Sequence, residues 1–334
     1  MKVLVLGASG YIGTRLVQAL SDSGWADPVA ASRSAIPGAH ARRLDTTDAL
    51  ALEQALRGVD AVVNCVAGSA EAITRGATAL AEAARRSGCR KIVHFSSMSV
   101  YGKLEGDLTE EAAKDSSIGW YARAKNAAED AMAAFAAGGG SVVILRPGCV
   151  WGPGSELWVA RIARLLQAHR LGDLGAAGDG WTNLVHVADV CAAVLAALRQ
   201  QPAEGSTRVY NLAAPDSPRW NEYFVDLALQ IGAVPVARIG PGQLLADTRL
   251  AAPPLKLLER AFQRTRGDAR RVPEVFPPGL LSLFGRQLRL RSSRAEEELG
   301  VCWTSYPKGL AEAAQWWETA RPIAAHGAPL AARW

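Results

Sequence analysis

The stretch Gly7-Ala8-Ser9-Gly10-Tyr11-Ile12-Gly13 directly follows the apolar run Lys2–Leu6 and leads into a helical pattern over Gly13–Ser21. Glycines at such a place allow a tight turn and let backbone N–H groups approach a pyrophosphate at the helix N-terminus. A glycine pattern alone is weak evidence, but its position between a strand and a helix is the context that supports it. The stretch therefore predicts a dinucleotide-binding loop after the first strand of a parallel sheet.

Short β-branched runs alternate with helical patterns through the first 150 residues, as in βαβ units. The predicted strands are Lys2–Leu6, Pro28–Ala31, Ala61–Val66, Lys91–Ser96 and Val142–Arg146. The predicted helices are Gly13–Ser21, Asp48–Leu56, Thr74–Arg86 and Trp120–Ala137. Because the strands are apolar on both faces, we expect helices on both sides of a doubly wound parallel sheet.

The alternation loosens after Pro147, which indicates a second, smaller and irregular α/β region. We expect residues 1–150, with a contribution from about 182–213, to form the cofactor domain, residues 151–181 and 214–320 the substrate domain, and residues 321–334 a loosely held tail. Predicted elements there are the helices Leu157–His169, Val187–Leu198, Trp220–Ile231, Arg294–Leu299 and Tyr306–Thr319, and the strand Arg208–Ala213. The seven prolines between Val234 and Gly279 should interrupt any long element.

Composition narrows the class of protein. A chain of 334 residues that is 49% hydrophobic is not a disordered, collagenous or small disulfide-linked protein. No run of about 18 uncharged apolar residues and no cleavage-site pattern is present, so we expect no membrane span and a cytoplasmic location. The five scattered cysteines lack Cys-x-x-Cys spacing and indicate reduced thiols without a zinc site. No basic pattern with interleaved aromatics suggests a nucleic-acid partner.

The net charge of +5 has a local origin. Nine arginines and two acidic residues fall between Arg260 and Arg294, so this segment carries +7 and the rest of the chain −2. Either these arginines receive an anionic group on the substrate or they cover a solvent-exposed, proline-broken lid. We favour the lid.

The end of the second strand bears on cofactor choice. An acidic residue at this place accepts hydrogen bonds from the adenosine ribose and selects NAD. The sequence instead reads Ala31-Ser32-Arg33-Ser34, in which a guanidinium and two hydroxyls would receive a 2′-phosphate. The segment therefore predicts NADP, with Arg15 as a further cation within reach.

Hydroxyls and a lysine suggest the chemistry. Tyr121 and Lys125 are four residues apart on one helix face, and the segment His94–Gly102 supplies serines just after a buried strand. A tyrosine with a pKa near 10 is a poor base at neutral pH unless a cation stabilises its phenolate. The set suits carbonyl reduction or alcohol oxidation, with a serine hydroxyl positioning the substrate oxygen. His94 and His169 have no metal-ligand spacing and are expected to be packing or surface residues.

Taken in order, these motifs resemble the extended short-chain dehydrogenase/reductase family, which includes nucleotide-sugar epimerases and dehydratases. The motifs that carry the resemblance are the glycine loop, the serine-rich segment, the Tyr-x-x-x-Lys pair, Leu145–Gly154, Asn183–Val190, Val209–Leu212 and Ser293–Gly300. The resemblance implies a Rossmann-type doubly wound parallel sheet with a C-terminal substrate domain, and a homodimer formed through the helices that bear the Tyr-x-x-x-Lys pair.

The resemblance also assigns residue roles. It implies that Tyr121 is the general acid/base, that Lys125 lowers its pKa and binds the nicotinamide ribose, and that Ser97 polarises the carbonyl. It places Gly7, Gly10, Ile12 and Gly13 at the pyrophosphate, Asp45 at the adenine, and Ala67 and Gly68 along the cofactor. Together with Tyr121 and Lys125, we expect further cofactor contacts from Ser9, Tyr11, Ser32, Arg33, Ser34 and Pro147.

Two departures from the family pattern bear on the substrate. Cys149 stands where sugar-nucleotide enzymes usually carry an asparagine that helps hold the diphosphate, and Ser97-Met98-Ser99 lacks the carboxylate that dehydratases use. Nine of the ten tryptophans lie at or after residue 120, and indoles make wide apolar walls. We expect a substrate pocket lined by Ser99, Trp120, Cys149 and Trp151, although Trp120 and Trp151 could equally fill a core.

These observations lead to one preferred hypothesis and two alternatives. We expect an NADP-dependent oxidoreductase that reduces a ketone or aldehyde on a fairly apolar small molecule, or oxidises the alcohol. The first alternative is a nucleotide-sugar epimerase of the same family. The second is a non-catalytic NADP-binding regulatory protein, which would have no need of Tyr121 and Lys125 together.

Overall fold

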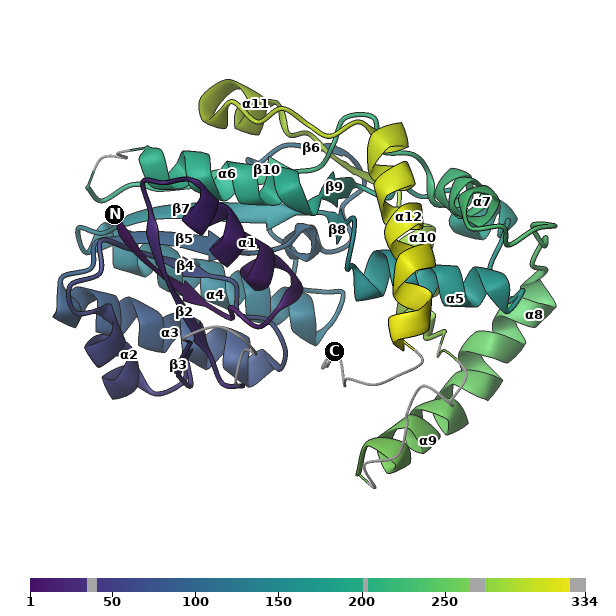
Figure 1. Ribbon diagram of the computed structural model, residues 1–334, viewed down its shortest axis with the longest axis horizontal. Coiled ribbons are helices and arrows are strands. Elements are labelled where there is room, and N and C mark those ends of the chain that lie inside the picture. The colour runs from purple at the N-terminus through teal and green to yellow at the C-terminus, as the bar shows by residue number, and fades with distance from the viewer. Residues whose placement is uncertain (35–40, 201–203, 265–273, 275, 325–334) are drawn as a thin grey trace.

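The computed structural model describes residues 1–34, 41–200, 204–264, 274 and 276–324. Its described residues form a central sheet of seven parallel strands in the order β10-β7-β5-β4-β1-β2-β3 (Figure 1). The strands are β1 (Lys2–Leu6), β2 (Asp27–Ser32), β3 (Arg42–Arg43), β4 (Ala61–Asn64), β5 (Lys91–Phe95), β7 (Ser141–Pro147) and β10 (Thr207–Leu212). The chain order reverses between β1 and β4, which is where such sheets bind their ligands.

Helices cover both faces of this sheet. The side chains of β1 alternate, so that Val3 and Val5 pack into one core and Leu4 and Leu6 into the other. The first core is covered by α1 (Tyr11–Asp22), α6 (Val187–Arg199) and α11 (Ser293–Leu299), and the second by α2 (Ala49–Leu56), α3 (Ala70–Ser87) and α4 (Trp120–Ala137). This arrangement confirms the predicted doubly wound Rossmann-type fold.

Helix ends follow local capping. The α3 helix begins four residues before the predicted start at Thr74 because the hydroxyl of Ser69 accepts a hydrogen bond from the backbone N–H of Ala72 at 3.2 Å. The helix ends at Gly88, whose positive φ of 77° suits a glycine. The α2 helix is capped in the same way by Asp48.

A third core lies beyond the sheet and is rich in aromatic rings. Trp220 and Phe224 of α7 pack against Phe284 of α10, with ring centroids 4.6 and 4.9 Å apart. Two small parallel pairs, β8 (Cys149–Trp151) with β9 (Leu184–His186) and β6 (Gly106–Leu108) with β11 (Leu288–Leu290), border this region. Its helical elements are η1 (Met98–Tyr101), η2 (Glu156–Ala160), α5 (Arg161–Gln167), η3 (Gly175–Gly178), α7 (Trp220–Gln230), α10 (Pro278–Phe284) and α12 (Tyr306–Ala324).

One stretch is more helical than its prolines indicate. The elements α8 (Pro241–Leu245), η4 (Ala246–Ala251) and α9 (Ala252–Arg264) follow one another without a break. Pro241 is the first residue of α8, where a missing N–H costs no hydrogen bond. Pro253 and Pro254 follow the wide π-type turn of η4, which shifts the backbone carbonyls that a proline ring would otherwise meet in a regular helix. The prediction that prolines interrupt every long element between Val234 and Gly279 is therefore wrong.

The last helix of the described chain is longer than predicted. The α12 helix continues to Ala324, five residues beyond its predicted end, and residues 325–334 of the predicted tail lie outside the described residues. Within the described ranges, no helix has both the length and the apolar character needed to cross a bilayer.

Candidate active site

The glycine loop is closed so tightly that side chains are excluded from two of its positions. Gly7 has a φ of 75°, and a Cβ atom there would lie 3.0 Å from the backbone of Cys65. A Cβ atom on Gly13 would lie 2.3 Å from the carbonyl oxygen of Gly7. Gly10 lies between them, exposed, and donates its backbone N–H to that same carbonyl at 3.0 Å. With no side chains at these positions, a ligand can reach the backbone of the loop. This fits the cradle that a dinucleotide pyrophosphate requires.

The loop is connected to the end of β2 by two hydroxyls. Ser9 Oγ and Ser32 Oγ are 2.7 Å apart, and Ser32 Oγ also accepts a hydrogen bond from the backbone N–H of Ser34 at 3.2 Å. Arg33 is exposed beside them. Hydrogen bonds from Thr47 lower the pKa of Asp45, and Arg33 lowers it further by its charge. The structure thus brings the predicted adenosine-side residues together around one strand end.

Three residues of the first turns of α1 lie close to the glycine loop in sequence and have different surroundings. The hydroxyl of Tyr11 is buried without a hydrogen-bond partner, and burial raises its pKa. Ile12 is half-buried beside it. Arg15, which was expected as a further cation for the 2′-phosphate, donates from its Nη2 to the carbonyl of Pro153 at 2.6 Å. Arg15 therefore connects α1 to the loop after β8.

The predicted catalytic residues lie together: Tyr121 and Lys125 in the first turns of α4, and Ser97 just after β5. The hydroxyl of Ser97 forms a hydrogen bond with Tyr121. Lys125 Nζ lies 5.9 Å from the centroid of the Tyr121 ring. Burial raises the pKa of Tyr121 to about 12, and the Ser97 hydrogen bond only partly offsets this rise. The phenol is therefore protonated at neutral pH and available as a proton donor.

Lys125 is buried and held by backbone carbonyls. Its Nζ donates to the carbonyl of Phe95 at 2.7 Å and approaches that of Val66 at 3.5 Å. Burial lowers the pKa of Lys125 to about 8, while Cys65 and Glu129 partly oppose the shift. The ammonium group is thus fixed between the ends of β4 and β5, next to Tyr121.

A buried polar pair of Asn64, which the sequence did not bring to attention, and His94, which was expected to be a packing or surface residue, supports this corner. Asn64 is the last residue of β4, and its Oδ1 accepts a hydrogen bond from the backbone N–H of Val66 at 3.1 Å. Its Nδ2 lies 3.1 Å from Nδ1 of His94 on the neighbouring strand. Burial lowers the pKa of His94 to about 3, so the imidazole is neutral. A polar residue ending the otherwise apolar strand Ala61–Asn64 was the signal available in the sequence.

The four predicted pocket residues divide into two groups. Trp120 is 40% exposed and meets the edge of Tyr121, with ring centroids 5.6 Å apart. The hydroxyl of Ser99 is buried without a hydrogen-bond partner. Trp151, in contrast, is 3% exposed and stacks on Tyr306 at 5.7 Å.

Cys149 is likewise buried in the aromatic third core, and burial raises the pKa of its thiol. Trp151 and Cys149 therefore fill a core in this structure instead of forming an open wall. The other predicted contacts lie at strand ends: Ala67 and Gly68 follow β4 in the turn to α3, and Pro147 is the last residue of β7.

The arginines in and after β11 are engaged by the protein itself. Arg289 lies over the ring of Trp181 at 4.4 Å, and Arg291 pairs with Asp107 at 2.5 Å. Arg294 also takes part in ion pairs with carboxylates. For these three side chains the structure supports neither a free lid nor an open anion site. Three further arginines of the basic segment lie outside the described residues: Arg266, Arg270 and Arg271.

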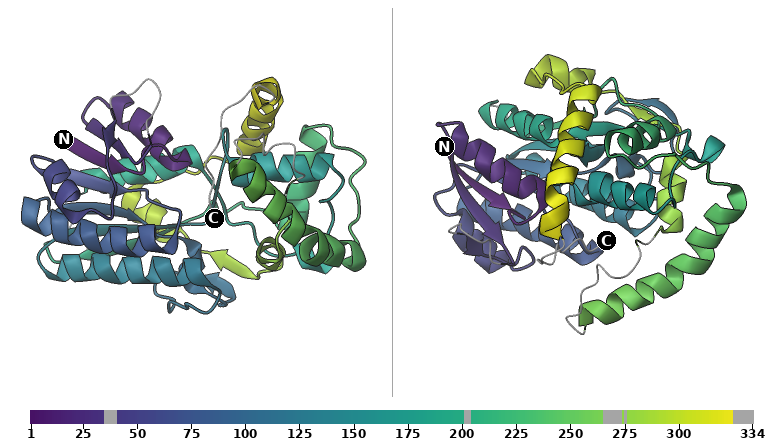
Figure 2. Two further views of the ribbon diagram at one scale, coloured as in Figure 1. Left: turned by 90° about the horizontal axis from the view of Figure 1, so that it is seen from below. Right: turned by 45° about the vertical axis from the view of Figure 1, so that its right-hand side comes forward.

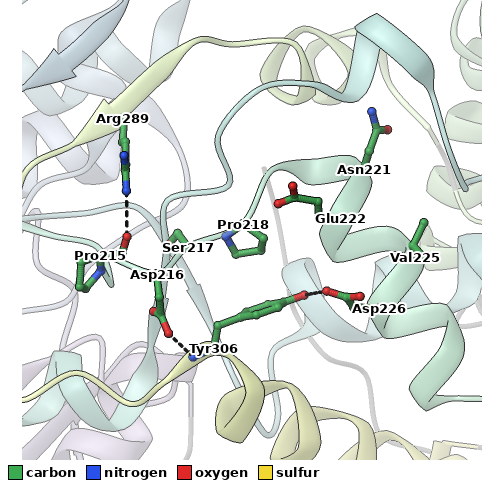
Figure 3. A pocket seen from close by; sticks show the side chains of 10 residues that line it. All are labelled: Pro215, Asp216, Ser217, Pro218, Asn221, Glu222, Val225, Asp226, Arg289 and Tyr306. Atoms are coloured by element: carbon green, nitrogen blue, oxygen red, sulfur yellow. Dashed lines mark hydrogen bonds between the residues drawn. The ribbon is translucent and has the colours of Figure 1, made fainter.

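An open surface hollow next to α7 shares no residue with the proposed catalytic set (Figure 3). The hydroxyl of Tyr306 donates to Asp226 at 2.8 Å, and Asp216 accepts the backbone N–H of Tyr306 at 2.7 Å. These two hydrogen bonds hold Tyr306 in place at the edge of the hollow. Within the described ranges, no group of three or more His, Cys, Asp or Glu side chains is placed to hold a metal ion.

The contacts among the predicted cofactor and catalytic residues lie along the carboxyl ends of neighbouring strands. From β2 to β5 they run through Ser32, the glycine loop, Val66 and Lys125 to Tyr121. This edge spans the point between β1 and β4 where the strand order reverses. The glycine cradle, the hydroxyls and the buried ammonium fit a nicotinamide dinucleotide laid along this edge.

Comparisons with known proteins agree with this geometry. The model of the NAD dependent epimerase/dehydratase family matches residues 3–213. The chain is 28% identical over 267 residues to the ceramide reductase of Caulobacter vibrioides (strain NA1000 / CB15N), covering 75% of this chain and 77% of that protein. It is 30% identical over 199 residues to the 2-alkyl-3-oxoalkanoate reductase of Stenotrophomonas maltophilia (strain K279a), covering 54% of this chain and 59% of that protein.

A solved structure shows the same fold at lower sequence identity. The dTDP-glucose 4,6-dehydratase DesIV from Streptomyces venezuelae, with NAD and TYD bound, superposes with a TM-score of 0.73 at 21% identity, covering 97% of this chain and 98% of that one. The sequence-based resemblance is thereby confirmed. The chain belongs to the NAD dependent epimerase/dehydratase family and is an NAD(P)-dependent enzyme of the short-chain dehydrogenase/reductase type.

Proposed function

We propose that the protein is an NADP-dependent reductase that converts a ketone or aldehyde on a largely apolar molecule to the alcohol. The observation that carries the proposal is the placement of Tyr121, whose hydroxyl is hydrogen-bonded to Ser97 and whose ring lies next to the ammonium group of Lys125. The dinucleotide, when bound, supplies a hydride from C4 of its nicotinamide ring. The remaining requirement is a proton for the new alkoxide, which these residues can deliver.

Each residue has a distinct role in the proposed reduction. The Ser97 hydroxyl donates a hydrogen bond to the substrate carbonyl oxygen and holds it near Tyr121. Tyr121 transfers its phenolic proton to that oxygen as negative charge develops there. Lys125 stabilises the resulting phenolate by its charge and contacts the nicotinamide ribose.

Three observations support an apolar substrate. Both curated relatives are reductases whose names denote lipid or alkyl-substituted carbonyl compounds. The family resemblance implies an asparagine at position 149 in enzymes that hold a sugar-nucleotide diphosphate, and the buried Cys149 does not supply that amide. The exposed indole of Trp120 lies directly beside Tyr121 and offers an apolar surface to a substrate.

A panel of carbonyl compounds assayed with NADPH and with NADH tests this proposal. We expect long-chain ketones or aldehydes to be reduced with net oxidation of NADPH. An isomerised sugar nucleotide formed without net cofactor consumption would instead identify an epimerase. Cofactor binding without turnover on any substrate would favour the regulatory alternative.

Arg33 should determine the preference for NADP. With Arg33→Ala, we expect kcat/KM for NADPH to fall by about 10- to 100-fold, because a charge-assisted contact with the 2′-phosphate is lost. The value for NADH should change little. Arg57→Ala, which removes an exposed arginine from the end of α2, is the matched control. Equal losses with both cofactors would refute the assignment of Arg33.

The pH dependence of the reduction should follow Lys125. Since its pKa is lowered to about 8, the ammonium charge is present at pH 7 and lost as the pH rises past 8, whereas Tyr121 stays protonated to about 12. We expect kcat/KM for reduction to be flat below pH 7.5 and then to decline by about tenfold per pH unit. A Lys125→Arg variant keeps its charge, so its profile should stay flat over this range whatever its absolute rate. Reduction that accelerates between pH 8 and 10 would contradict the model.

A further inference from the structure

The elements α8, η4 and α9 form a continuous helical arm, residues 241–264, that extends away from the rest of the molecule (Figure 1 and the right view of Figure 2). The arm is attached near its beginning. Leu244 and Thr248 are buried, and Arg170 of the body pairs with Asp247 at 3.1 Å. Beyond η4, the helix leads outward from this anchor.

Large apolar side chains are exposed along the arm. Leu245, Leu250, Leu257 and Leu258 are 51, 72, 66 and 48% exposed. These residues account for four of the ten large hydrophobic side chains that are exposed among the described residues, within a span of only 14 positions. Single exposed leucines are ordinary on protein surfaces, but a group of this size marks an interaction site.

The helix geometry gathers three of these leucines on one side. Leu245 and Leu250 are five residues apart across the wide turn of η4, where residues i and i+5 lie one above the other. Leu250 and Leu257 are seven residues apart, which is two turns of an α-helix. The π-type turn therefore corrects the register between the two halves of the arm and produces a continuous apolar stripe.

Basic residues accompany this stripe. Arg249 and Lys256 are exposed on the arm. The nearby carboxylate of Asp247 is already paired with Arg170. The arm thus combines apolar and cationic groups, in the segment where the sequence concentrates its positive charge.

This combination selects one kind of partner. Two copies of the arm would bring like charges together, which opposes self-association. A nucleic acid would leave the leucine stripe exposed to water. An anionic lipid surface accommodates both groups, since leucines enter the acyl boundary while Arg249 and Lys256 meet the headgroups.

We propose that the helical arm docks the protein on an anionic membrane surface, with Leu245, Leu250 and Leu257 inserted at the interface. The inference goes beyond the proposed reductase activity and stands on the arm alone. An enzyme docked in this way would meet an apolar substrate where such molecules concentrate.

Vesicle co-sedimentation of the full chain, without substrate, tests the docking. We expect binding to phosphatidylcholine vesicles that contain phosphatidylglycerol, and at least about tenfold weaker binding to phosphatidylcholine alone. The Leu250→Gln/Leu257→Gln variant should lower partitioning to the anionic vesicles by at least about tenfold. The Arg249→Gln/Lys256→Gln variant should reduce the preference for anionic lipid. Leu50→Gln/Leu229→Gln, which changes two similarly exposed leucines on α2 and α7, is the matched control.

The outcomes separate the docking from the catalytic proposal. No vesicle binding by the wild-type chain, or equal losses in the arm and control variants, would overturn the docking whatever the activity. Self-association that disappears in Leu250→Gln/Leu257→Gln, without vesicle binding, would assign the stripe to a second copy of the chain and also overturn it. Circular dichroism and Tm of each variant report whether the fold is retained. Lack of carbonyl reduction together with normal vesicle binding would refute only the proposed reductase function.

Discussion

Tyr121→Phe should lower kcat for carbonyl reduction by about 10²- to 10⁴-fold, which is the usual contribution of a positioned general acid. The ring and its edge contact with Trp120 remain, so only the transferable proton and the hydrogen bond to Ser97 are lost. We expect the Kd for NADPH and the Tm to change little. Steady-state kinetics with NADPH and the best carbonyl of the panel, together with a cofactor titration, measure these quantities.

Tyr210→Phe is the control for this experiment. Tyr210 is a buried tyrosine of β10 whose hydroxyl donates to Glu298 at 2.8 Å, away from the Ser97 corner. The control should keep its kcat. If Tyr121→Phe retained full reductase activity while Tyr210→Phe also did, another group would have to supply the proton and the mechanism would be wrong.

Gly13→Ala should weaken NADPH binding by more than about tenfold and destabilise the fold by about 1–3 kcal/mol, as other overpacked sites do. The added Cβ atom would lie 2.3 Å from the carbonyl oxygen of Gly7 and 2.8 Å from Cα of Ala8. Both are backbone atoms, so the loop itself must move to relieve the overlap. Isothermal titration with NADPH and chemical denaturation measure the two effects.

Gly242→Ala provides the matched comparison. Gly242 lies in α8, where a Cβ atom would meet nothing within 4 Å. Alanine there should be neutral or slightly stabilising because it favours the helix. Unchanged NADPH affinity in Gly13→Ala would show that the dinucleotide does not use the glycine cradle.

Much of the sheet could be predicted because its determinants are local. The strand Lys2–Leu6 and the helix Trp120–Ala137 have the predicted limits, since apolar runs and helical periodicity define them directly. The glycine loop was recognisable because a strand precedes it and a helix follows it. The spacing of four residues placed Tyr121 and Lys125 on one helix face, and the family resemblance implied that Ser97 acts with them.

Features that depend on long-range packing could not be predicted. Trp151 fills a core because Tyr306, 155 residues later, stacks on it, and sequence spacing contains no information about that contact. Arg15 is engaged by Pro153 for the same reason. The helical arm was missed because the prolines that usually end a helix fall at its start and after a π-type turn, which no periodicity reveals.

Isotope tracing shows whether the protein catalyses a net reduction of an apolar carbonyl compound by NADPH, as we propose. NADPH deuterated on the transferred face of C4 is incubated with the best substrate of the carbonyl panel, and the product is examined by mass spectrometry. We expect one deuterium on the carbinol carbon for each NADPH oxidised. A product that carries no deuterium, or one that forms without consumption of NADPH, would contradict it.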